Sequence, residues 1–127
     1  MLEASAASGF RPLLQSLIDE VPGVLGVAFC DEEGEAVDLC GAENVDEYDL
    51  KVMAASWSLS MDLLRRSVEE KGAGSTALVS VVCGRYTYVV APVGSTYFLA
   101  VWAESDVSLG KGLSAARRLV SILRAEV

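Results

Sequence analysis

Apolar residues recur along the chain with two spacings, and these divide it into expected helices and strands. In three segments they repeat every three or four residues, as on one face of a helix: residues 10–21, residues 47–70, and the stretch that begins near residue 108. Five short apolar runs have strand length, at residues 24–31, 35–41, 76–83, 86–92 and 97–103. The order helix, two strands, helix, three strands, helix predicts an α+β domain.

Turn and capping residues separate these elements. An acid-rich turn with Gly34 joins the first two strands as a hairpin. Asp46 or a neighbour is expected to cap the long helix, and Ser108 the last helix. The first eight residues are small and polar without periodicity, so we expect residues 1–8 to be flexible and residues 9–127 to form one domain.

The long predicted helix carries apolar residues on two opposite sides. At about 100° per residue, one face, here called the inner stripe, collects Leu50, Met53, Ala54, Trp57, Met61, Leu64 and Val68. The opposite face, here called the outer stripe, collects Tyr48, Val52, Ala55, Leu59 and Leu63. A helix that covers its own sheet needs only one such face. The second therefore predicts contact with another surface, unless loops of the same chain cover it.

Composition supports an interaction domain. Hydrophobic residues make up 52% of the 127 residues, yet no apolar run approaches the roughly 20 residues that span a bilayer. The net charge of −8 argues against binding to nucleic acid or to an anionic membrane. Cys30, Cys40 and Cys83 are scattered through apolar sequence and no signal peptide is evident, which predicts a cytoplasmic protein with reduced, buried thiols.

Candidate chemistry is sparse. The chain has no histidine, which excludes a Ser-His-Asp triad, a Cys-His pair and zinc sites built on imidazole. The segment GKGLS lacks the upstream glycine of a phosphate-binding loop. The acidic residues between Asp31 and Asp49 do not have the spacing of a calcium-binding EF-hand. We therefore expect no active site, no metal and no cofactor.

Four short motifs occur in a fixed order between about residue 10 and the end of the chain. They are V-P-G before the first strand, D-x-x-G in the first turn, APVG before the fifth strand, and leucine-glycine at the start of the last helix. Together they resemble the Roadblock family, which includes the dynein light chain and bacterial MglB-type partners of Ras-like GTPases.

This resemblance implies a profilin- or longin-like fold. In it, a five-stranded antiparallel sheet carries the second helix on one face and the first and third helices on the other, with strands two and three at the edges. Family members form dimers with a ten-stranded sheet and the two long helices side by side. The second strand carries Glu35 and Asp38, which we expect to protect it on the solvent side, whereas the third has no charge. We therefore expect the third strand to form the homodimer edge, through Thr76, Leu78, Val79, Ser80, Val81 and Val82.

The resemblance also implies a function: a noncatalytic homodimeric regulator or scaffold of a Ras-like GTPase in bacterial cell polarity or motility. MglB-type members accelerate GTP hydrolysis by rearranging the GTPase's own catalytic groups. An arginine inserted from Arg65 or Arg66 is the alternative route, although the family is not known for it. We expect the partner-binding surface to be the outer stripe together with Arg66.

Two alternatives remain open at this stage. An adaptor would bind another Roadblock protein or a polarity scaffold through the same faces, without acting on a GTPase. A small-molecule sensor would need an apolar pocket with a few convergent polar groups, and Tyr86, Tyr88 and Tyr97 are the candidates for these.

Overall fold

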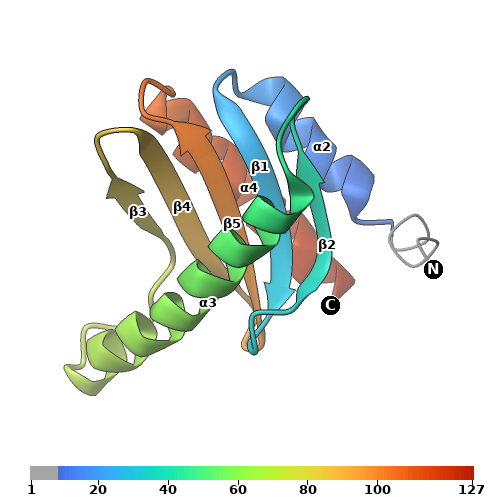
Figure 1. Ribbon diagram of the computed structural model, residues 1–127. Helices are drawn as coiled ribbons and strands as arrows, with labels where there is room; N and C mark the ends of the chain where they lie inside the picture. The colour runs from blue at the N-terminus through green and yellow to red at the C-terminus, as the bar shows by residue number, and fades with distance from the viewer. Residues whose placement is uncertain (1–8) are drawn as a thin grey trace.

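The computed structural model describes residues 9–127, so the expected flexibility of residues 1–8 lies outside the described residues. Its elements follow the predicted order (Figure 1). They are α2 (Arg11–Glu20), β1 (Val24–Asp31), β2 (Ala36–Gly41), α3 (Glu47–Glu70), β3 (Val79–Val82), β4 (Tyr86–Val93), β5 (Tyr97–Glu104) and α4 (Leu109–Glu126).

The strands form one antiparallel sheet in the order β2-β1-β5-β4-β3. The predicted fold class is confirmed, with β2 and β3 at the edges. The two hairpins, β1-β2 and β3-β4, flank the central strand β5, which pairs with β1 on one side and with β4 on the other. Within the described residues, the outer sides of β2 and β3 therefore pair with no other strand.

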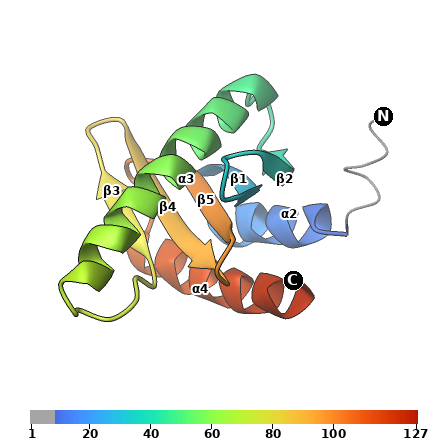
Figure 2. The same cartoon turned by 90° about the horizontal axis from the view of Figure 1, so that it is seen from below.

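Helices cover both faces of the sheet, α3 on one and α2 with α4 on the other (Figure 2). Successive residues of β1 alternate between these faces: Val27 and Phe29 pack toward α2 and α4, whereas Ala28 and Cys30 pack toward α3. The larger core, beneath α2 and α4, includes Leu14, Leu17, Val101, Leu119 and Leu123. The chain thus folds in three layers, with a sheet buried on both faces.

Capping residues fix where the longer helices begin. Asp46 precedes α3, and its carboxylate accepts a hydrogen bond from the backbone N–H of Tyr48 at 2.8 Å. Ser108 precedes α4, and its hydroxyl accepts from the backbone N–H of Lys111 at 3.5 Å. Both caps stand where the sequence predicted them.

The third strand is shorter than expected. It begins at Val79 and not at Thr76, so Thr76 and Leu78 precede the strand. Leu78 packs against the core beneath α4. The C-terminal part of α3 extends past the edge of the sheet, and the segment from residue 71 to 78 returns the chain to β4 before pairing begins (Figure 1).

Two further expectations are wrong. Asp38 is buried and not exposed to solvent: Arg11 lies 3.5 Å from its Oδ1, which also accepts from the backbone N–H of Leu39 at 2.8 Å. A carboxylate tolerates burial when it is paired with a cation and hydrogen-bonded. Cys83 is exposed in the β3-β4 turn, whereas Cys30 and Cys40 are buried as expected.

Candidate partner-binding surface

The inner stripe of α3 packs on the sheet. Leu50 is 0% exposed, and Ala54 and Met61 are buried with it. Leu50 lies directly over Gly26 of β1, where an added Cβ would come within 2.7 Å of a leucine methyl group. Glycine at this position therefore lets the helix approach the sheet closely. Leu64 is an exception and is exposed; the C-terminal part of α3 runs past the sheet (Figure 1).

The outer stripe faces solvent along most of its length. Tyr48 is 71% exposed, Leu59 is 56% exposed and Leu63 is 63% exposed, and Val52 is exposed as well. Ala55 is half-buried, because the β1-β2 turn touches it: a Cβ at Gly34 would lie 3.3 Å from the Ala55 Cα. A loop of the chain itself thus covers Ala55. No part of residues 9–127 covers the large apolar side chains of the stripe.

Arg65 and Arg66 follow the outer stripe in the sequence but differ in accessibility. Both guanidinium groups pair with Asp62, at 3.2 Å and 3.1 Å respectively. Arg65 also lies over the ring of Phe98, 5.2 Å from its centroid, and is largely buried. Arg66 is mostly exposed. Of the two arginines considered for insertion into a GTPase, Arg66 is the accessible one.

An aromatic cluster adjoins the N-terminal half of the outer stripe. The Tyr86 ring lies 5.3 Å from that of Trp102, and the Tyr88 ring lies 5.1 Å from that of Trp57. With Tyr48, Val52 and Met53 of α3, the strand residues Tyr86, Tyr88 and Trp102 line an open hollow of about 470 Å³. Partial burial raises the pKa of Tyr88. The sequence interpretation missed this extension of the surface, although the alternation of Tyr86 and Tyr88 along one strand was a signal for it.

The three tyrosines considered for a sensor site do not converge. Tyr86 and Tyr88 face α3, whereas Tyr97 lies on the opposite face of the sheet, with its ring 5.2 Å from that of Phe29. A single pocket cannot use all three.

The exposed edge of β3 lies next to this surface. Val79 and Val81 are half-buried on the side of α3, while Ser80 and Val82 are exposed, Val82 at 65%. Within residues 9–127, no strand pairs with the outer edge of β3. Its backbone N–H and C=O groups on that side are available for pairing with another strand.

The acidic turn between β1 and β2 has a structural role. One carboxylate oxygen of Asp31 accepts from the backbone N–H groups of Glu33 and Glu35, at 2.9 Å and 3.0 Å. In the described part of the chain, no cluster of three or more His, Cys, Asp or Glu side chains is arranged to hold a metal ion. None of the helices in that part is both long and apolar enough to cross a bilayer.

The sequence matches no protein-family model and no curated protein. The fold, in contrast, matches solved structures over nearly the whole chain. A Roadblock/LC7 domain from Streptomyces avermitilis superposes with a TM-score of 0.79 at 24% identity, and the match covers 91% of this chain and 95% of that chain. The chain has the Roadblock fold.

Two further solved structures are similar to it. MglC from Myxococcus xanthus is 28% identical with a TM-score of 0.67, over 93% of this chain and 98% of that chain. The gliding protein MglB from Thermus thermophilus is 15% identical with a TM-score of 0.79, over 90% of this chain and 84% of that chain. The Roadblock resemblance predicted from the sequence is thus confirmed.

Proposed function

We propose that this chain is a noncatalytic homodimeric regulator or scaffold of a Ras-like small GTPase, acting in the cytoplasm in cell polarity or motility. The observation that carries the proposal is the outer stripe, a row of large apolar side chains exposed on a helix whose other side packs on the sheet from Leu50 to Met61. The similarity of the fold to a bacterial gliding protein supports a role in motility.

The homodimer forms by pairing of two β3 edges, which places the two α3 helices side by side over a ten-stranded sheet. Two features support this arrangement. The edge strand has no charged residue to oppose pairing. Ser56 and Ser60 are small and exposed on the flank of α3, and the Ser60 hydroxyl donates to the Ser56 carbonyl at 2.9 Å. That hydroxyl therefore does not need water when another helix packs against it.

The partner binds across the outer stripe, the adjoining aromatic hollow and Arg66. A surface with an apolar centre, aromatic side chains and a charged rim is typical of protein interfaces. The GTPase supplies the catalytic groups, and this chain changes their arrangement by docking.

The test measures GTP turnover by a Ras-like GTPase of the same organism, with and without this chain, alongside complex formation by light scattering. We expect a complex and a several-fold change in turnover, both lost in Leu59→Asp. Arg66→Ala separates the two routes to acceleration. Docking alone predicts a modest effect, whereas an inserted arginine predicts a loss of about 10³-fold or more.

The adaptor hypothesis uses the same surface, so the same experiment distinguishes it. A complex that leaves GTP turnover unchanged identifies an adaptor. The absence of a complex with any Ras-like GTPase of the organism overturns the proposed function.

A further inference from the structure

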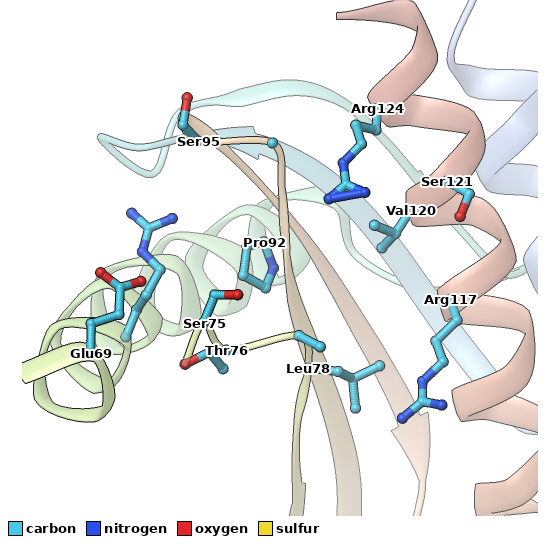
Figure 3. A pocket seen from close by; sticks show the side chains of 13 residues that line it. Glu69, Ser75, Thr76, Leu78, Pro92, Ser95, Arg117, Val120, Ser121 and Arg124 are labelled. Atoms are coloured by element: carbon cyan, nitrogen blue, oxygen red, sulfur yellow. The ribbon is translucent and has the colours of Figure 1, made fainter. Parts of the chain in front are cut away.

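A cavity of about 750 Å³ lies between α4, the segment that leads into β3, and the β4-β5 turn (Figure 3). Arg65 and Glu69 of α3 also line it, but neither Arg66 nor any residue of the outer stripe does, so the cavity lies apart from the exposed apolar surface described above. Arg117, Val120, Ser121 and Arg124 form its wall on α4, a spacing of three and four residues that places them on one helix face. The opposite wall includes Ser75, Thr76, Leu78, Pro92 and Ser95.

Two of the three arginines that line this cavity, Arg117 and Arg124, are unusual within the chain. Five of the seven arginines contact an acidic or aromatic partner: Arg11 with Asp38, Arg65 and Arg66 with Asp62, Arg85 with the Tyr86 ring, and Arg118 with Glu20. Arg117 and Arg124 have no such partner among residues 9–127, although the chain carries a net charge of −8. Both line the same cavity, and Figure 3 shows both on the side of α4 that faces Leu78 and Pro92.

The remaining polar lining is rich in hydroxyl groups. Ser75, Thr76, Ser95 and Ser121 contribute one each, and Glu69 is the one carboxylate among the described lining residues. The Thr76 hydroxyl oxygen is buried and has no hydrogen-bond partner in the described structure. A buried hydroxyl without a partner is costly, so a ligand oxygen that accepted its hydrogen bond would be favoured.

We propose that this cavity binds a small organic molecule that carries a phosphate group. Arg117 and Arg124 bind the phosphate, because the planar guanidinium group donates paired hydrogen bonds that match phosphate oxygens. The Ser75 hydroxyl donates to a remaining oxygen, and the buried Thr76 hydroxyl donates to another when its side chain rotates toward the ligand. Leu78, Pro92 and Val120 supply apolar contacts for the organic part of the ligand. The site goes beyond the proposed GTPase role and does not depend on it.

The test is an NMR titration of the full chain with inorganic phosphate and with phenyl phosphate, at constant ionic strength. We expect saturable shifts of the backbone amides of residues 75–78 and 94–95. Phenyl phosphate should bind several-fold more tightly than inorganic phosphate, because it also reaches the apolar wall.

Matched variants identify the binding groups. Arg117→Gln with Arg124→Gln should weaken binding at least about tenfold, since each charge-assisted hydrogen bond contributes this much or more. Lys111→Gln with Arg118→Gln removes the same charge from the same helix outside the cavity and should leave binding unchanged. Thr76→Val should weaken binding without lowering the unfolding midpoint, because the hydroxyl it removes has no partner in the protein.

Three results would overturn the site. They are the absence of saturable shifts with both probes, equal losses in the two double variants, and retention of wild-type affinity in the Arg117 and Arg124 variant. Equal affinity for inorganic phosphate and phenyl phosphate would contradict the proposal that the ligand has an organic part.

Discussion

The two sides of α3 are built from similar apolar residues but meet different surroundings. Leu50 and Met61 on the inner stripe are sealed against the sheet, while Leu59 and Leu63 on the outer stripe are more than half exposed. Helix propensity does not distinguish them, since all four are good helix formers. The difference is that only the inner stripe contacts the sheet. The inner stripe therefore stabilises the fold, and the outer stripe is available to a partner.

The two edges of the sheet differ in a parallel way. At the β2 edge, Arg11 of α2 contacts the buried Asp38. At the β3 edge, Val82 is exposed and no strand of the described part of the chain pairs with the outer side of β3. The accessible edge and the outer stripe of α3 adjoin, which supports a single continuous interface.

The largest expected effect separates the two sides of α3 by stability. Met61→Ala should lower the free energy of unfolding by about 2–5 kcal/mol, because it removes buried methylene groups and leaves a cavity. Leu59→Ala should change it by about 0.5 kcal/mol or less. Urea unfolding at a protein concentration where light scattering reports a monomer measures both. Equal losses would mean that the two sides are packed alike.

The next effect uses pH to examine the buried side. Burial raises the pKa of the Cys30 thiol from 9.0 to about 11, and the nearby Ser58 hydroxyl offsets part of this rise. Because the folded-state pKa exceeds the unfolded one, this contribution to stability is fully present below pH 9 and is lost as pH rises toward 11. The loss should be on the order of 2 kcal/mol. Urea unfolding between pH 8 and about 11 measures it, and Cys30→Ala should flatten the dependence. An unchanged slope in that variant would assign the dependence to other groups.

A third effect compares the two edges. Val81→Lys in β3 should weaken self-association by about tenfold or more, because pairing brings two copies of the new charge near each other. Val37→Lys in β2 is the matched control and should leave the dissociation constant unchanged. Sedimentation velocity over a concentration series measures both. Weakening by Val37→Lys alone would place the dimer at the other edge.

The smallest expected change in stability is that of Leu59→Asp, the variant that should also lose partner binding. Leu59→Asp should alter the free energy of unfolding by about 0.5 kcal/mol or less, because the side chain is exposed, and it should abolish partner binding. Circular dichroism and urea unfolding report the fold, and pull-down with the GTPase reports binding. If the variant instead unfolds, the two stripes have been assigned to the wrong sides.

Local signals in the sequence predicted much of this fold. The cap at Asp46, the apolar run of β1 and the cap at Ser108 depend on neighbouring residues, and each of these elements lies where it was expected. The outer stripe also follows from helical periodicity. Ala55 is the exception, because its contact with Gly34 depends on how a distant turn packs.

Features that depend on tertiary contacts were not predictable. In the sequence, Asp38 has the pattern of a solvent-facing strand residue, because nothing near it indicates that Arg11 of α2 lies beside it in the fold. The short β3 reflects how far α3 extends past the sheet, which periodicity does not give. The arginine cavity joins α4 to a segment about 40 residues away in sequence, so its walls meet only in the folded chain.

The most direct test of the exposed interface is solution mass by multi-angle light scattering over a dilution series. The account predicts a mass near twice the 13.4 kDa of one chain, falling toward one chain in Val81→Lys. A mass of one chain at every concentration of the wild-type protein would contradict it, because the β3 edges would then not bring two copies together.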